Sequence, residues 1–302
     1  MASNKALVQY NDFFEMLSDE VRMGAYAQAI EACVKPGDVV LDLGAGTGIL
    51  GFMALRAGAA KLYCIEKSNA IELARAVAGR NGFEDRVVFF EANSKDVELP
   101  ERVDLIVSET LGCFGLDEST LDFTADARRR FLKPGGTLLP RKINLKVSPV
   151  EAPEAYAKLD FWHDVQGIDF TPAYELFSTK LMNETVAPDA LLAEPQTLAE
   201  VDFHTNDSPT LEARALLHIQ RPARVHGVAG WFDLDLAEGI QLSTSPSSPA
   251  THWRQAFFPI RETLHVVEGD ILEFTLRLAP AAASSDNTTI SYQYRCTQIG
   301  AK

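Results

Sequence analysis

A glycine-rich turn, LDLGAGTGIL at positions 41–50, follows directly on one apolar run and leads into another. A buried strand that enters such a turn and continues as a helix is typical of open α/β sheets. Further apolar runs predict strands at 61–66, 86–91, 103–109 and 135–140. The segments between them are long enough for crossover helices, so residues 38–140 predict a parallel sheet covered on both faces.

The chain before this sheet is expected to be helical over residues 1–34. Phe13, Phe14, Leu17 and Val21 recur at spacings that can form one apolar helix face. Ser18 is the residue type that caps a helix start, so we expect it to cap a second helix.

After Pro140 the pattern changes to alternating, β-rich stretches, which predict an antiparallel sandwich or barrel. Gly269 and Asp270 separate two such runs, and this predicts a hairpin. Residues 152–185 interrupt the strands with helical, aromatic-rich sequence. We therefore expect two domains, 1–141 and 142–302, with an inserted helical arm at about 152–185.

Charge and cysteine content limit the classes of partner. The chain has 28 Lys and Arg against 42 Asp and Glu, a formal net charge of −14. Nucleic-acid binding needs clustered cations, so this balance argues against it and favours cationic ligands. Four cysteines lie scattered without paired spacing, and no signal peptide or long apolar run is seen. The sequence predicts a cytoplasmic protein with no membrane or metal partner.

The glycine-rich turn predicts a nucleoside cofactor. Gly44, Gly46 and Gly48 let the backbone approach a ligand at the helix start. Asp42, on the strand before the turn, can order the loop or face a cationic ligand. Glu66 ends the second strand, where a carboxylate can accept hydrogen bonds from ribose hydroxyls. No Walker sequence is present, and dehydrogenases that bind NAD usually carry GxGxxG instead, so the pattern favours S-adenosylmethionine.

Two acids follow the fourth predicted strand. Glu109 and Glu118 are nine residues apart across a glycine-containing loop, VDLIVSETLGCFGLDES. A loop of this length can fold back and aim both carboxylates at one point. Converging carboxylates suit a planar guanidinium, because its N–H groups pair with two oxygens. Two solvated surface acids are the alternative interpretation of the same pair.

A distant segment, Thr251-His252-Trp253-Arg254-Gln255, decides between them. The double-acid loop, MLSDEVR at 16–22 and THWRQ, in this order, together resemble the protein arginine methyltransferase family. The similarity covers about residues 12–298. It implies a Rossmann-like methyltransferase domain, then a β-barrel, with the 152–185 arm forming a homodimer.

The resemblance also implies a role for individual residues. Glu109 and Glu118 would bind the substrate guanidinium, and Asp19 with His252 would relay the proton lost after methyl transfer. Trp253 and Met16 would line the substrate pocket. The cofactor-binding set would be Arg22, which pairs with the cofactor carboxylate, together with Asp42, Gly44, Gly46, Glu66 and Ser94.

Departures from the family pattern leave the acceptor open. The position of an acid that commonly contacts the adenine amine is Lys95 here, with Asp96 beside it as a substitute. The rim of the double-acid loop is also altered. An arginine in a protein or peptide is one acceptor; free L-arginine or another guanidino small molecule is the alternative. Free arginine would need a cation for its carboxylate, for which Arg254 is available. A catalytically silent scaffold is a third alternative, but the presence of both glutamates, Asp19 and His252 argues against it.

Overall fold

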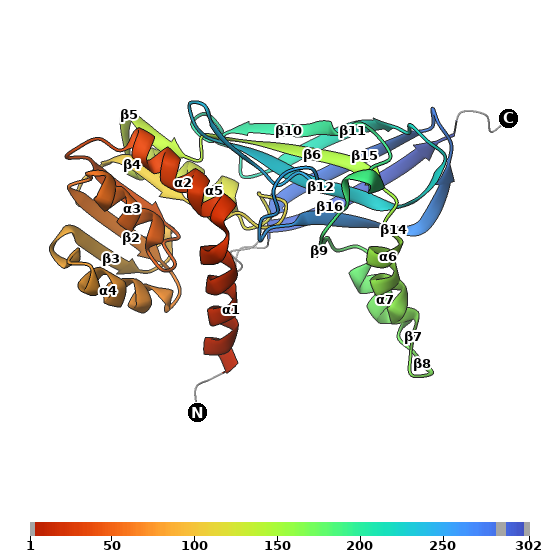
Figure 1. Ribbon diagram of the computed structural model, residues 1–302, viewed down its shortest axis with the longest axis horizontal. Helices are drawn as coiled ribbons and strands as arrows, with labels where there is room; N and C mark the ends of the chain where they lie inside the picture. The colour runs from red at the N-terminus through yellow and green to blue at the C-terminus, as the bar shows by residue number, and fades with distance from the viewer. Residues whose placement is uncertain (1–3, 282–287, 299–302) are drawn as a thin grey trace.

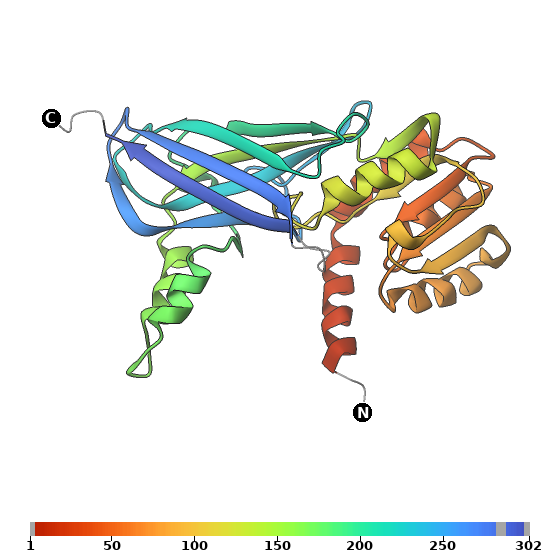
Figure 2. The ribbon, with the colours of Figure 1, turned by 180° about the vertical axis from the view of Figure 1, so that it is seen from behind.

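The computed structural model describes residues 4–281 and 288–298, the side chains from residue 11 onward. Two units lie side by side along the long axis of the molecule, and the helix α1 and the arm project from the same side (Figures 1 and 2). The elements of the first unit are α1 (Asn4–Ser18), α2 (Glu20–Cys33), β1 (Val39–Leu43), α3 (Ile49–Ala57), β2 (Lys61–Glu66), α4 (Ala70–Arg80), η1 (Glu84–Arg86), β3 (Val87–Glu91), η2 (Ser94–Asp96), β4 (Val103–Ser108), α5 (Thr120–Phe131) and β5 (Leu132–Leu139).

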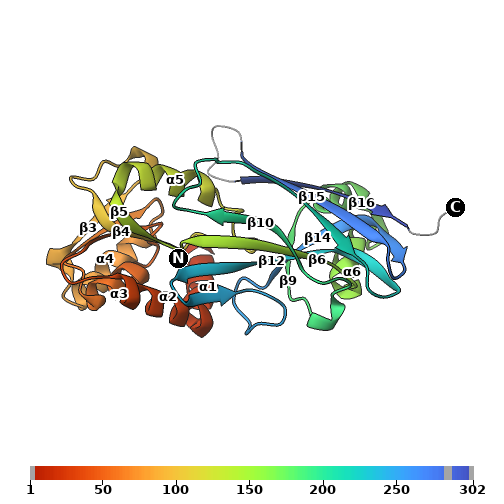
Figure 3. The same ribbon diagram turned by 90° about the horizontal axis from the view of Figure 1, so that it is seen from above.

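The first unit is the predicted parallel sheet. Its strand order is β3-β2-β1-β4-β5, and every neighbouring pair is parallel. The apolar runs of β1, β2 and β4 are almost wholly buried, because α2 and α3 lie on one face of the sheet and α5 on the other (Figure 3). The order reverses beside β1, so the carboxyl ends of β1, β2 and β4 meet where such sheets bind ligands.

The second unit contains two antiparallel sheets. One has the order β10-β6-β12-β14-β9, with β13 paired to β12, and the other has the order β11-β15-β16. The strands are β6 (Lys142–Val150), β9 (Met182–Glu184), β10 (Gln196–Asp202), β11 (Leu211–His218), β12 (Ala223–Ala237), β13 (Ile240–Ser243), β14 (Gln255–Val266), β15 (Ile271–Pro280) and β16 (Thr288–Thr297). A short turn, η4 (Pro188–Ala190), lies between β9 and β10. The predicted α/β unit followed by a β-barrel is confirmed.

The arm lies between β6 and β9. It consists of α6 (Pro153–Asp160), η3 (Phe161–His163), β7 (Asp164–Val165), β8 (Ile168–Asp169) and α7 (Thr171–Phe177). Trp162 is at its centre and contacts the rings of Phe161, Phe170 and Phe177. The arm is therefore a small aromatic-packed unit that extends away from the barrel (Figure 1).

Two local predictions are wrong. Ser18 ends α1, and its hydroxyl donates to Phe14 O at 2.6 Å; the cap of α2 is Asp19, whose carboxylate accepts from Arg22 N. The hairpin at Gly269-Asp270 is not formed either. β14 pairs with β12 and β9, whereas β15 pairs with β11 and β16. The turn carries the chain from one sheet to the other, a corner that alternation alone does not distinguish from a hairpin.

Candidate active site

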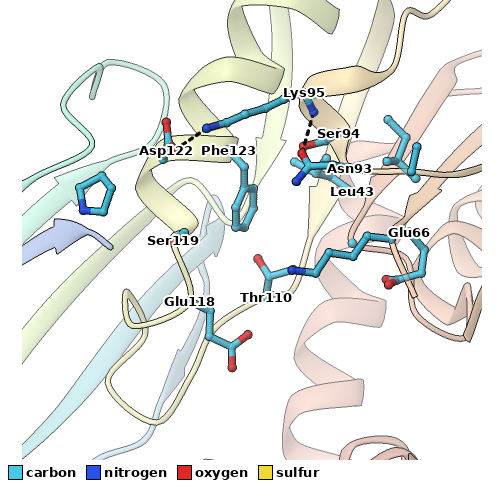
Figure 4. A pocket seen from close by; sticks show the side chains of 15 residues that line it. Leu43, Glu66, Asn93, Ser94, Lys95, Thr110, Glu118, Ser119, Asp122 and Phe123 are labelled. Carbon is cyan, nitrogen blue, oxygen red and sulfur yellow. Dashed lines mark hydrogen bonds and ion pairs between the residues drawn. The ribbon is translucent and has the colours of Figure 1, made fainter. Parts of the chain in front are cut away.

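The glycine-rich turn closes over the carboxyl end of β1 and opens a cavity of about 300 Å³, the glycine-loop cavity. Its lining includes Gly44, Glu66 and Ser94, together with Phe123 of α5 (Figure 4). Gly44 has φ +74°, and a Cβ there would lie 2.5 Å from the Thr110 methyl group, so the position requires glycine.

Two carboxylates order the turn. Asp42 is buried and accepts from Gly51 N at 2.8 Å, which fixes the start of α3. Burial raises the pKa of Asp42 to about 7, against the opposing effect of this hydrogen bond. Glu66 accepts from Gly46 N at 3.0 Å and from Ser68 N at 2.7 Å. A carboxylate offers about four acceptor sites, so Glu66 can still accept from the hydroxyls of a ribose.

The double-acid loop folds back on itself between β4 and α5. The Thr120 hydroxyl donates to Thr110 O at 2.8 Å, which ties the two ends of the loop together. Gly115 has φ +74°, and a Cβ there would lie 2.3 Å from Ile143 Cδ1 on the barrel. The loop therefore takes its shape from a glycine turn pressed against the second unit.

Both acids of the loop line a second cavity of about 420 Å³, the double-acid cavity. Its described lining is Asp12, Glu15, Met16, Glu109, Thr110, Leu111, Gly112, Cys113, Glu118, Asn183, His252 and Trp253. Thr110 and Glu118 also line the glycine-loop cavity, so the two cavities meet at these residues.

The two acids differ in environment. Glu109 is bound by Arg22, whose Nε lies 2.8 Å from Glu109 Oε2 and whose Nη2 contacts the same oxygen, in an almost fully buried ion pair. Glu118 lacks such a printed cation. Burial, and then the nearby charges of Asp117 and Glu109, raise the pKa of Glu118 to about 7.

Asp19 joins the start of α2 to the segment before β14. One carboxylate oxygen accepts from Arg22 N at 2.9 Å, and the other lies 2.9 Å from both the backbone N and the ring Nδ1 of His252. Burial alone would raise the pKa of Asp19, but the hydrogen bonds from Arg22 and His252 lower it below its usual value. The acid therefore stays ionised and orients the imidazole.

Trp253 joins the two units at the site. Its indole Nε1 donates to Leu111 O in the double-acid loop at 2.7 Å, and the ring is almost fully buried. It lies 4.4 Å from the His252 ring and 5.9 Å from the Arg22 guanidinium carbon. The pocket wall thus fixes both the loop and the imidazole.

Family models match both units. One, described as the arginine methyltransferase oligomerization subdomain, matches residues 142–299, and another, a methyltransferase domain, matches residues 34–178. Protein arginine N-methyltransferase 1 of Chlamydomonas reinhardtii is 34% identical over 93% of this chain and 84% of its own length. The corresponding protein of Saccharomyces cerevisiae is 31% identical over 95% of this chain and 85% of its own.

Solved structures agree. The Trypanosoma brucei PRMT1 enzyme-prozyme heterotetrameric complex with AdoHcy has a TM-score of 0.85 at 30% identity, covering 94% of this chain and 93% of that one. Arabidopsis thaliana protein arginine methyltransferase 10 has a TM-score of 0.80 at 28% identity, covering 95% and 93%.

The chain belongs to the protein arginine methyltransferase family. It is an S-adenosylmethionine-dependent arginine N-methyltransferase, as the sequence predicted.

Most of the predicted arginine methyltransferase site comes together at the two cavities. Gly44, Glu66 and Ser94 line the glycine-loop cavity. Met16, Glu109, His252 and Trp253 line the double-acid cavity, and Glu118 lines both. Asp19, Asp42 and Gly46 stand behind these linings and hold them through hydrogen bonds.

Arg22 and Asp96 lie elsewhere than the resemblance implied. Arg22 lines neither cavity; it pairs with Glu109, so its contact with a cofactor carboxylate stays a prediction. Asp96 is exposed and outside the lining, whereas Lys95 lines the cavity and pairs with Asp122. Sequence reasoning also missed Asn183, which β9 brings in from the end of the arm. No local motif marks that position.

Proposed function

We propose that this methyltransferase modifies the guanidinium of arginine within a polypeptide, with the residues of the two cavities in the roles given below. The observation that carries the proposal is that the glycine-loop cavity and the double-acid cavity share Thr110 and Glu118. A methyl donor in the first cavity would therefore lie beside a guanidinium in the second, and methyl transfer depends on this proximity.

S-adenosylmethionine, held by Gly44, Glu66 and Ser94, would supply an electrophilic methyl group on its sulfonium. Glu109 and Glu118 would bind the guanidinium N–H groups and draw its positive charge towards themselves. This leaves electron density on the nitrogen that faces the methyl group. Arg22 keeps Glu109 ionised and oriented through their buried ion pair. The Asp19–His252 pair would accept the proton that the methylated nitrogen loses.

The charge of the double-acid cavity supports a peptide substrate over free arginine. Asp12 and Glu15 of α1 add two acids to the lining, and no Lys or Arg is among the described lining residues. Free arginine would bring an α-carboxylate to this acidic wall, whereas a peptide presents a neutral amide there. Arg254, the cation that the sequence offered for that carboxylate, is exposed and outside the lining.

The test is mass spectrometry after incubation with isotope-labelled S-adenosylmethionine and either an Arg/Gly-rich peptide or free arginine. We expect label on the peptide, and label on free arginine alone would overturn the choice of substrate. Glu118→Gln should lower turnover at least about 100-fold, because the charge that binds the guanidinium is lost. Affinity for S-adenosylhomocysteine, measured by calorimetry, should change little in this variant and serves as the control. Full turnover would exclude the double-acid assignment.

We also propose a homodimer formed by the arm, in a cytoplasmic setting. Phe161, Ile168 and Leu176 of the arm are 55%, 60% and 56% exposed, which is unusual for large apolar side chains in one small unit. The four cysteines are free thiols, which supports a reducing compartment. Among the described residues no helix is long and apolar enough to cross a membrane.

A further inference from the structure

An ion pair stands on the wall of the glycine-loop cavity that η2 and α5 form together. Lys95 Nζ lies 2.5 Å from Asp122 Oδ2, and both residues line the cavity. Figure 4 shows the pair beside Phe123, on the side of the cavity away from Glu66. The mechanism proposed above gives neither residue a task.

The wall is held together at a second point. Arg130 of α5 donates to Ser94 O at 3.1 Å and to Lys95 O at 3.3 Å, and it also contacts Val97 O. Asn93 accepts from Lys95 N at 3.0 Å, which fixes the start of η2. The η2 turn is therefore tied to α5 through its backbone as well as through the Lys95 side chain. This fixes where Asp122 stands relative to the cavity.

The two ends of the cavity differ in what they can contact. Thr110 and Glu118 adjoin the double-acid cavity, so the reactive end of the methyl donor belongs there. Glu66 is the ribose acid of the proposed site. The remaining wall, formed by Ser94, Lys95, Asp122 and Phe123, is left for the nucleobase. Phe123 offers an aromatic surface to a planar ring.

The chemistry of adenine selects one group on this wall. The exocyclic amine of adenine donates hydrogen bonds, and a lysine ammonium only donates as well, so Lys95 is unable to read it. Among the side chains described on this wall, Asp122 carries the only carboxylate. We propose that Asp122 accepts the hydrogen bond of the exocyclic amine and that Lys95 is the positioning residue that holds its carboxylate. This inference rests on the proposed cofactor site.

Calorimetry with S-adenosylhomocysteine and S-inosylhomocysteine tests it. The inosine ring replaces the amine with a carbonyl oxygen, which a carboxylate repels. The natural chain should bind the adenosyl compound about tenfold more tightly or better, the effect of one hydrogen bond to a charged group. Asp122→Asn should reduce this preference to about twofold or less, because an amide can donate to the inosine oxygen.

Lys95 is tested by Lys95→Met and Lys95→Arg in the same assay. Met should lower the preference for the adenosyl compound, and Arg should restore it, since Arg can still pair with Asp122. A purely structural role for Lys95 would weaken both ligands alike and would overturn the positioning assignment. Asp96→Asn is the matched control, because this neighbouring acid is exposed and outside the cavity lining.

The outcomes separate this inference from the proposed function. Tight binding of S-adenosylhomocysteine with an unchanged preference in Asp122→Asn would overturn the role of Asp122 and leave the cofactor site standing. A preference lost in Asp96→Asn would move the reading group to Asp96. Failure of the natural chain to bind either compound would overturn the cofactor site and this inference together.

Discussion

Glu118 is the residue at which the two cavities meet, and its ionisation should govern substrate binding. Its pKa is raised to about 7 by burial and by the neighbouring Asp117 and Glu109 carboxylates. Only the ionised form attracts a guanidinium, so kcat/KM for a peptide should rise with pH through about 7 and then level off. Asp117→Asn removes one neighbouring charge and should move this midpoint to lower pH. An initial-rate profile from pH 5.5 to 9 measures both, and an unmoved midpoint would contradict the assignment.

At this scale the sequence predicts residue types more readily than their partners. Glu109, Glu118 and His252 were identified from spacing and resemblance, and the structure lines the double-acid cavity with all three. The Arg22–Glu109 ion pair was not foreseen, because two residues 87 positions apart reveal no orientation. Asp122 escaped notice for the same reason. It is an ordinary acid in the first turn of a helix, and only the path of η2 gives it a partner.

At the scale of elements, the start of α2 is joined to the chemistry through Asp19. Asn can accept the cap bond from Arg22 N, but it would present an N–H towards the N–H of His252. Asp19→Asn should therefore lower turnover about tenfold or more while the helix stays capped. Asp19→Ala should also lose the cap, at about 1 kcal/mol in the free energy of unfolding. Urea denaturation and initial rates separate the two effects; normal turnover in Asp19→Asn would remove Asp19 from the relay.

Element boundaries show where local patterns lose information. The strands of the parallel sheet were predicted well, because both faces are buried and each strand is a continuous apolar run. The corner at Gly269 and Asp270 was not. Its flanking runs alternate like a hairpin, yet each pairs with strands distant in sequence. Strand pairing is a property of the whole barrel, and neither run encodes it by itself.

At the scale of the whole molecule, the arm extends from the barrel with its large apolar side chains facing solvent (Figure 2). A stable protein–protein interface buries roughly 1,200–2,000 Å² and centres on apolar side chains. The predicted dimer gives these side chains a partner surface, which a lone chain lacks. The natural chain should therefore run at about twice its mass of 33.1 kDa in light scattering after gel filtration.

Replacing Phe161, Ile168 and Leu176 together with Ser should yield monomers, because the replaced side chains would otherwise form the contact. Their exposure in the single chain means that the change removes little intrachain packing, so the thermal midpoint should shift by no more than a few degrees. Leu216→Ser, an exposed apolar position on β11, is the control and should stay dimeric. A natural chain that is monomeric at micromolar concentration, or a dimeric triple variant, would assign the apolar arm another partner. Monomers that lose turnover while retaining S-adenosylhomocysteine binding would show that assembly supports the acceptor side of the site.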